Sequence, residues 1–272
     1  ESSGLGPLEL EVLERPSAKD QQHVFQKLIP KYGELIISHA NKNHNIVALD
    51  ADLILDTGLI PFQKSMPNRF IECCIAEQDM VSQAGGMALN GLLPIVHSFS
   101  CFLSTRPTEQ MYTNATEYTK IIYVASLAGV LPGGPGHSHQ AVRDISTVGS
   151  IPNLTMIEPC CEDELELLTD WAVNENNQST YLRLISLPFE VRFNYPTNHN
   201  LKKGQGIVLN EGSKICIFAY GPIMLNNAIT ASNTIKKELS IDIKVINMPG
   251  VNKIDNAWLE KILEEIESWW SI

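Results

Sequence analysis

Hydrophobic positions along the first two thirds of the chain alternate between two periods. Short apolar runs predict buried β-strands at residues 45–50, 70–75, 93–97, 120–125, 154–157 and 180–185. Between them, apolar residues at helical spacing predict helices over residues 19–39, 77–91, 101–118 and 162–174, with a further helix start near Val142. Pro30 is expected to kink or split the first helix. Strands that alternate with helices predict an α/β fold with a mostly parallel, doubly wound sheet covered on both faces.

The last third of the chain carries a second, smaller pattern. Residues 189–203 are rich in Asn and Pro and lack either period, which predicts an interdomain linker. Strands at 214–220 and 243–247 and helices at 223–239 and 258–268 then predict a smaller α/β domain. We assign the domains to residues 19–188 and 206–272, with a linker at 189–205. Two parallel strands make a poor independent sheet, so we expect this domain to be incomplete and the native chain to continue beyond Ile272.

Composition narrows the class of protein. The 272 residues are 44% hydrophobic and 19% charged, which is ordinary for a globular protein with a sizeable core. Twenty Lys and Arg against 31 Asp and Glu give a net charge of −11, which repels phosphate backbones and anionic lipid. We therefore expect neither nucleic acid nor a membrane as a partner, and the longest nearly apolar run, 121–132, is shorter than the ~20 residues that span a bilayer.

The positions of the six cysteines indicate the redox state of the compartment. They form no C-x-x-C motif, and most lie inside apolar stretches. This usage favours reduced, buried thiols and a cytoplasmic location.

Candidate chemistry lies where the predicted strands end. Asp52, Glu77, Phe102 and His139 each lie in the segment that follows a predicted strand. Loops at the carboxyl ends of parallel strands line one crevice, so these four side chains could converge. A buried carboxylate, an aromatic ring and a histidine suit a flat heteroaromatic ligand, hydrogen-bonded at a ring nitrogen and stacked on its face. The structural alternatives are an acid at a helix N-terminus for Glu77 and a turn-capping acid for Asp52.

Three segments together resemble a known family. Residues 75–80 (IAEQDM), 99–106 (FSCFLSTR) and 133–140 (GGPGHSHQ), in this order and spacing, resemble the pyrimidine-binding domain of transketolases and deoxyxylulose-phosphate synthases, which are thiamine-diphosphate enzymes. The segments DADL, IPNL, IEP and YLRL, which begin at residues 50, 151, 157 and 181, extend the resemblance over about residues 46–188. The tail from Lys214 resembles the C-terminal domain of the family.

The resemblance assigns roles to the strand-end residues. Glu77 matches the glutamate that contacts the N1 nitrogen of the cofactor's aminopyrimidine. A carboxyl group bonded there stabilises the basic imino tautomer that activates the cofactor, so we expect Glu77 to be both catalytic and cofactor-binding. Phe102 matches the aromatic residue that stacks on the pyrimidine, with Phe99 behind or beside it, and Asp52 matches an acid near the cofactor. His139 matches the histidine that faces the reacting substrate.

Three further residues are candidates for substrate binding. His97 ends a predicted strand beside the same edge of the sheet. Arg106 and Arg183 could each hold a phosphate through a bidentate fork. The alternatives are a satisfied core histidine for His97 and a surface ion pair for each arginine.

A motif of the family is missing. Transketolases hold Mg²⁺ and the cofactor's diphosphate with a Gly-Asp-Gly segment and a downstream Asn in another domain, and none of the 17 glycines here frames an aspartate in that way. We therefore expect no metal ligands in this chain. The resemblance implies a split transketolase, with a separate diphosphate-binding subunit that supplies the Mg²⁺ ligands, a heterotetramer as the assembly, and no activity of this chain alone.

The leading functional hypothesis is transfer of a two-carbon ketol unit between a ketose and an aldose, with sugar phosphates as the expected substrates. Residues 124–129 lack the histidine usual in transketolases, which leaves the donor and acceptor open. The alternatives are the beta subunit of a 2-oxo acid dehydrogenase, which has the same pair of domains, and a non-catalytic partner subunit.

Overall fold

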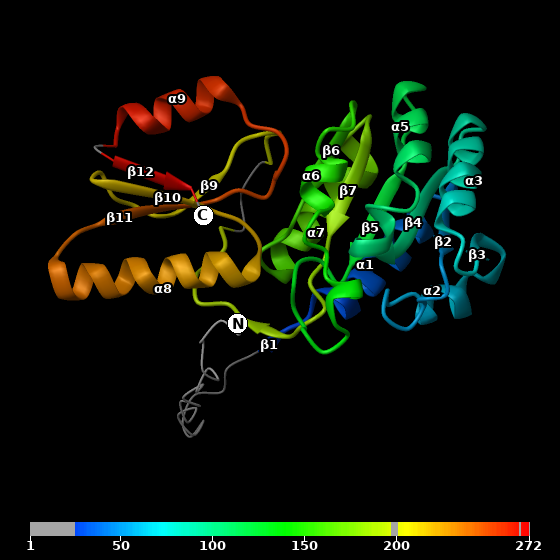
Figure 1. Ribbon diagram of the computed structural model, residues 1–272, viewed down its shortest axis with the longest axis horizontal. Coiled ribbons are helices and arrows are strands. Elements are labelled where there is room, and N and C mark those ends of the chain that lie inside the picture. The colour runs from blue at the N-terminus through cyan, green and yellow to red at the C-terminus, as the bar shows by residue number, and fades with distance from the viewer. Residues whose placement is uncertain (1–24, 197–200, 267, 272) are drawn as a thin grey trace, which may run out of the picture.

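A computed structural model describes residues 25–196, 201–266 and 268–271, which are organised around two sheets (Figure 1). The larger sheet has six strands, all parallel, in the order β3-β2-β4-β5-β7-β6. Its strands are β2 (Ile46–Asp50), β3 (Phe70–Glu72), β4 (Leu93–Phe99), β5 (Ile122–Ser126), β6 (Leu154–Ile157) and β7 (Ser179–Arg183). The prediction of a mostly parallel α/β sheet is confirmed.

Helices cover both faces of this sheet. They are α1 (Leu28–Lys42), α2 (Ile60–Ser65), α3 (Glu77–Leu89), α4 (Ser100–Leu103), α5 (Thr108–Thr116), α6 (Asp144–Val148) and α7 (Glu162–Asp170). Successive side chains of a strand point to opposite faces. Accordingly β2 places Ile46 and Ala48 in a core with α1, α2 and α7, and Val47 and Leu49 in a second core with α3 and α5.

Two prolines explain where the helices depart from the predictions. Pro30 is the third residue of α1, in the first turn, where it breaks no hydrogen bond within the helix, so the helix runs on to Lys42. Residues 19–24 of the predicted first helix lie outside the described residues, and the prediction was wrong at Phe25–Gln26, which form the short strand β1. The helix predicted over 101–118 is two helices, because Pro107 separates α4 from α5 and disfavours helical geometry in the residue before it.

The smaller sheet has four strands in the order β12-β10-β11-β9, so the expectation of two strands was wrong. They are β9 (Ile207–Asn210), β10 (Ile215–Ala219), β11 (Ile243–Asn247) and β12 (Ser268–Ser271). Strands β10, β11 and β12 are parallel, whereas β9 runs antiparallel to β11. Helices α8 (Pro222–Leu239) and α9 (Asn256–Glu264) lie on opposite faces, and β12 occupies residues predicted to end the last helix or to follow it (Figure 1).

The predicted linker is partly structured. Strand β8 (Phe189–Glu190) pairs antiparallel with β1 (Phe25–Gln26), which ties the start of the described chain to this segment. The backbone N–H of Arg192 then donates to Asn226 Oδ1 of α8 at 2.8 Å. Residues 197–200 of the predicted linker lie outside the described residues.

The two sheets are joined at the edge strand β6. The N–H of Glu158 donates to Pro249 O at 2.9 Å, and the N–H of Val251 donates to Met156 O at 3.0 Å. Asn252 adds side-chain hydrogen bonds to the same strand, including one from the N–H of Met156 at 2.9 Å. Because residues 249–252 bond to the edge of the larger sheet, the smaller unit is fixed against it.

Two further features of the described residues concern membrane-spanning helices and cysteines. No helix among the described residues is long and apolar enough to cross a membrane. All six cysteines are free thiols, and Cys101, Cys160, Cys161 and Cys216 are buried. The cytoplasmic location stays a prediction.

Candidate functional site

Glu77 lies in a buried position at the carboxyl edge of the larger sheet. It is the first residue of α3, where the positive end of the helix dipole favours a carboxylate, and only 2% of the residue is exposed. Ser98 of β4 donates its hydroxyl to Glu77 Oε1 at 3.1 Å. Arg106 Nη1 lies 2.7 and 2.8 Å from the two carboxylate oxygens. Glu77 is therefore an ion-paired acid beneath a partly exposed guanidinium.

An aromatic group lies beside this ion pair. The rings of Phe99 and Phe102 have centroids 5.9 Å apart, and the His139 ring meets Phe102 edge-on at 5.1 Å. Ser138 Oγ lies 3.0 Å from His139 Nδ1. The guanidinium carbon of Arg106 lies 4.0 Å from the centroid of Phe102, so Arg106 connects the acid to the rings. We call Glu77, Phe99, Phe102, Arg106 and His139 the strand-end cluster.

Two hollows open onto this cluster. One, of about 420 Å³, is lined by residues 75–79 and Arg106, so Glu77 lies in its wall. The other, of about 280 Å³, is lined by residues that include Phe102, His137 and Arg143. The cluster therefore combines a buried acid, aromatic rings and room for a ligand.

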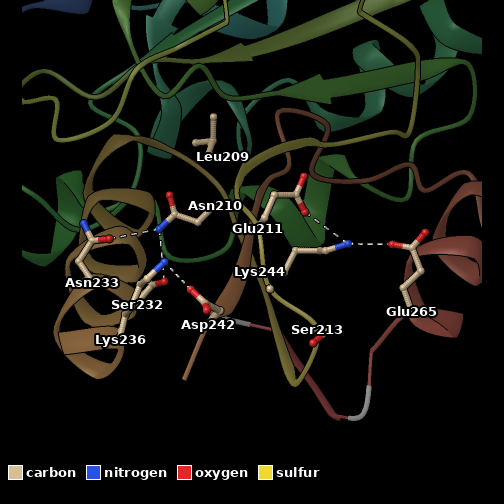
Figure 2. Close-up of a pocket in the computed structure, with 11 residues that line it drawn as sticks. Leu209, Asn210, Glu211, Ser213, Ser232, Asn233, Lys236, Asp242, Lys244 and Glu265 are labelled. Carbon is tan, nitrogen blue, oxygen red and sulfur yellow. Dashed lines mark hydrogen bonds and ion pairs between the residues drawn. The ribbon is translucent and has the colours of Figure 1, made fainter. Parts of the chain in front are cut away.

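A larger cavity of about 780 Å³ lies in the smaller unit, apart from the cluster (Figure 2). Its charged side chains pair with one another. Lys244 Nζ lies 2.9 Å from Glu265 and 3.8 Å from Glu211, and Lys236 lies 2.6 Å from Asp242. This cavity presents no unpaired cation among its lining residues and contributes nothing to the cluster.

Asp52 lies at the expected edge of the sheet but makes no contact with the rings. It is exposed after β2, in the left-handed region with φ 61°, and its N–H donates to Glu72 Oε1 at 2.9 Å. The turn is capped by Asp50 instead, which accepts from the N–H of Leu53 at 2.6 Å and from Thr57 at 2.7 Å. The cofactor-binding role of Asp52 stays a prediction.

His97 lies inside the core rather than at the surface of the site. It is 0% exposed, and its Nε2 and Nδ1 lie 2.7 Å from Tyr32 Oη and 3.0 Å from Leu49 O. A carbonyl only accepts, so Nδ1 carries the proton and Nε2 accepts from Tyr32. Burial lowers the pKa of His97 to about 4. This placement favours the satisfied core histidine over the substrate-binding role.

Arg183 is also buried, and its guanidinium lies between two acids. Its Nη1 lies 2.9 Å from Asp144 Oδ2 and its Nε 2.8 Å from Glu158 Oε2, ion-pair distances without good hydrogen-bond alignment. Burial raises the pKa of Glu158, and the neighbouring Arg183 opposes that rise. These ion pairs are therefore buried, unlike the surface ion pair weighed from the sequence. Arg183 also lines a cavity of about 370 Å³ together with Gly129 and Tyr220, and its substrate-binding role stays a prediction.

Sequence reasoning missed the residues that support the cluster. Ser100 begins α4, the helix that carries Phe102, and donates to Asp144 Oδ2 at 2.6 Å. Arg183 pairs with that same oxygen, so Asp144 connects it to the start of α4. The serines could have been found from the sequence, because Ser98 and Ser100 are polar residues on either side of Phe99 at the end of an apolar strand. Nothing local signalled Asp144, 44 residues further along the chain.

No group of three or more His, Cys, Asp or Glu within residues 25–196, 201–266 and 268–271 is arranged to hold a metal ion.

Comparison with known proteins now identifies the family. The family described as "Transketolase, pyrimidine binding domain" matches residues 30–186, more than half of the chain. The chain belongs to the transketolase family. A second family description, "Transketolase, C-terminal domain", matches residues 204–269 of this transketolase-family chain.

Curated relatives and solved structures agree with this assignment. A 1-deoxy-D-xylulose-5-phosphate synthase of Clostridium tetani is 33% identical over 234 residues, and one of Clostridium botulinum is 31% identical over 242 residues. Both alignments cover 86% of this transketolase-family chain, which spans only 37% of the length of either relative.

The solved structures include one described as "Split gene transketolase, inactive beta4 tetramer". It has a TM-score of 0.79 and 26% identity, and the match covers 90% of this chain and 79% of that one. A transketolase from Campylobacter jejuni has a TM-score of 0.77 and 19% identity, over 94% of this chain and 43% of that one, and supports the fold alone.

Proposed function

We propose that this chain provides the pyrimidine-binding half of a thiamine-diphosphate-dependent transketolase that transfers a two-carbon ketol unit between sugar phosphates. The observation that carries the proposal is the buried carboxylate of Glu77, which is joined through Arg106 to Phe102 and His139. We propose residues 19–188 as the domain that binds the pyrimidine, 189–205 as the linker and 206–272 as the C-terminal domain.

The strand-end cluster fits an aminopyrimidine. Glu77 is a buried carboxylate at the start of α3, which suits a hydrogen bond from a protonated ring nitrogen, and Phe102 presents a ring for stacking. When bound, the cofactor would supply the electron sink for carbon–carbon bond chemistry. Glu77 would set the protonation of the ring nitrogen that it contacts, and His139 would donate to or accept from substrate oxygens. Phe99 would support the position of Phe102.

We propose that a separate diphosphate-binding subunit provides the ligands for Mg²⁺ and the diphosphate, and that two copies of each chain form a heterotetramer. The similarity that supports a split enzyme is to the chain described as a split gene transketolase, of which the match covers 79% at 26% identity. The partner is recognisable as a polypeptide that carries Gly-Asp-Gly and a downstream Asn.

The decisive experiment co-purifies this chain with that partner and measures ketol transfer. Replacing Glu77 by Gln or Ala is expected to lower kcat about 10²- to 10⁴-fold, about 3–5 kcal/mol of barrier, because acid–base assistance is lost. The Gln variant keeps the shape of the side chain. The matched control is Asp163→Asn, an exposed acid in the first turn of α7 that lines neither hollow, and it should stay within about twofold of wild type. Full activity of Glu77→Gln would overturn the proposal.

A second candidate follows from the curated relatives. The identity of 33% over 86% of the chain to 1-deoxy-D-xylulose-5-phosphate synthase favours formation of that product as the alternative reaction. Assaying the same complex for 1-deoxy-D-xylulose 5-phosphate separates it from ketol transfer. Reductive turnover of a 2-oxo acid with a lipoyl partner would instead support a dehydrogenase beta subunit. Absence of all three reactions in the assembled complex would support the non-catalytic subunit.

A further inference from the structure

Arg106 makes the two contacts that the proposed function assigns to the cofactor's aminopyrimidine. Its Nη1 lies 2.7 and 2.8 Å from the oxygens of Glu77, and its guanidinium carbon lies 4.0 Å from the centroid of the Phe102 ring. One side chain therefore occupies both the acceptor and the stacking surface of the half-site.

The chemistry of the two groups explains the coincidence. A guanidinium is planar, offers N–H donors along its edge to a carboxylate and stacks by its face on an aromatic ring. An aminopyrimidine has a similar planar N–C–N unit and, when its ring nitrogen is protonated, likewise offers an N–H to a carboxylate and a face to an aromatic ring. We propose that Arg106 is an internal stand-in for the aminopyrimidine, which keeps the half-site closed until the cofactor displaces it. This inference rests on the proposed function.

Burial explains why the stand-in is stable. Glu77 is 2% exposed, and its other side-chain hydrogen bond comes from Ser98 at 3.1 Å. A carboxylate buried without a charged or strongly donating partner is costly, so Arg106 leaves only when another donor takes its place.

The side chain of Arg106 also has room to move away from Glu77. Its side chain is 39% exposed and borders the hollow of about 420 Å³ at residues 75–79. It lies between the end of α4 and the start of α5, outside both helices. The guanidinium can therefore turn into solvent without unfolding either helix. The ligand must first displace Arg106 from Glu77. The chain with Arg106 should therefore bind the ligand more weakly than the same chain without this arginine.

The test uses a probe that needs no diphosphate site, 4-amino-5-hydroxymethyl-2-methylpyrimidine, titrated into the full chain by calorimetry. Arg106→Ala is expected to bind the probe at least tenfold more tightly than wild type. Low millimolar guanidinium, which can refill the vacated place, should weaken binding to Arg106→Ala and leave wild type unchanged. Arg192→Ala is the matched control, because Arg192 is an exposed arginine that also pairs with an acid, Glu190, but lines neither hollow. It should stay within twofold of wild type.

The possible results separate this inference from the function on which it rests. Equal affinity of wild type and Arg106→Ala, or weaker binding by the variant, overturns the stand-in while leaving a pyrimidine site in place. No binding by either protein, with circular dichroism showing both folded, overturns the stand-in together with the proposed pyrimidine site. Tighter binding that guanidinium reverses supports both.

Discussion

At the scale of single residues, burial decides what the ionisable side chains can do. Glu77 and His97 both lie near the carboxyl edge of the larger sheet, yet Glu77 pairs with a partly exposed arginine whereas His97 is bonded only within the core. Sequence spacing placed both near one edge but did not separate them. Both side chains are buried, so their partners separate them: Glu77 can exchange a partly exposed arginine for a ligand, whereas the bonds of His97 within the core favour a structural role.

The burial of His97 predicts a pH-dependent stability. Unfolded His97 binds a proton below its ordinary pKa of 6.5, whereas in the fold burial lowers the pKa to about 4. The unfolded state therefore binds more protons between these values, and the stability of the fold decreases as the pH falls. Between pH 7.5 and pH 5 this residue should cost about 2 kcal/mol of unfolding free energy.

The measurement compares urea unfolding of wild type and His97→Gln at both pH values. The difference between the two proteins isolates the contribution of His97 from that of Asp50. Burial raises the pKa of Asp50 to about 6, so the folded state binds the proton more tightly there, and Asp50 adds to the stability of the fold as the pH falls below 6. The control is His44→Gln, since His44 is exposed and should follow wild type. Identical pH profiles for wild type and His97→Gln would contradict the prediction.

At the scale of elements, the position of Glu77 depends on how α3 packs against α5. Asn114 of α5 donates its amide to Val81 O of α3 at 3.0 Å. Gly85 of α3 faces that amide so closely that an added methyl group would collide with it, whereas nothing lies within 4 Å of the methyl position at the adjacent Gly86. Neighbouring glycines of one helix thus have different roles.

This contrast gives a paired prediction. Gly85→Ala should lower the unfolding free energy by about 1–3 kcal/mol, because the collision pushes α3 away from α5. Gly86→Ala should be neutral or should stabilise by up to about 1 kcal/mol, because alanine favours the helix and meets nothing. Chemical denaturation of the two variants tests this, and equal effects would show that α3 does not depend on close contact at Gly85.

Most elements of the larger sheet were predictable, for a physical reason. A strand buried on both faces is a continuous apolar run, and Leu154–Ile157 was placed without error. β9 and α2 were missed, since each is short and owes its stability to neighbours remote in sequence. The last helix was predicted too far along the chain, because the pairing of β12 with β10 is invisible to local periodicity.

At the scale of the whole molecule, the smaller unit is attached through residues 249–252. Asn252 accepts from the N–H of Met156 at 2.9 Å and donates to Leu154 O at 3.1 Å, so one side chain continues the pairing of the edge strand β6. The backbone bonds of Glu158 and Val251 lie beside it. The relative position of the two sheets is therefore fixed by hydrogen bonds of defined direction.

Removing this side chain should loosen the junction. Asn252→Ala leaves the N–H of Met156 without its acceptor and is expected to cost about 1–3 kcal/mol of unfolding free energy. Hydrogen exchange should become faster in β6 and at residues 249–252, with β2 and β4 unchanged. Asn233→Ala, at an exposed position on α8, is the control. Unchanged exchange at the junction in Asn252→Ala would contradict this view of the attachment.

The sequence by itself determined the α/β class and most strands of the larger sheet, and it offered Glu77, Phe102 and His139 as candidate site residues. These follow from local periodicity and from residue types in a recognisable order. Only the tertiary structure decided that Arg106 pairs with Glu77, that His97 and Arg183 are buried, and that the smaller sheet has four strands. The partners of a charge and its depth below the surface are set by chain segments distant in sequence, and local patterns contain no information about them.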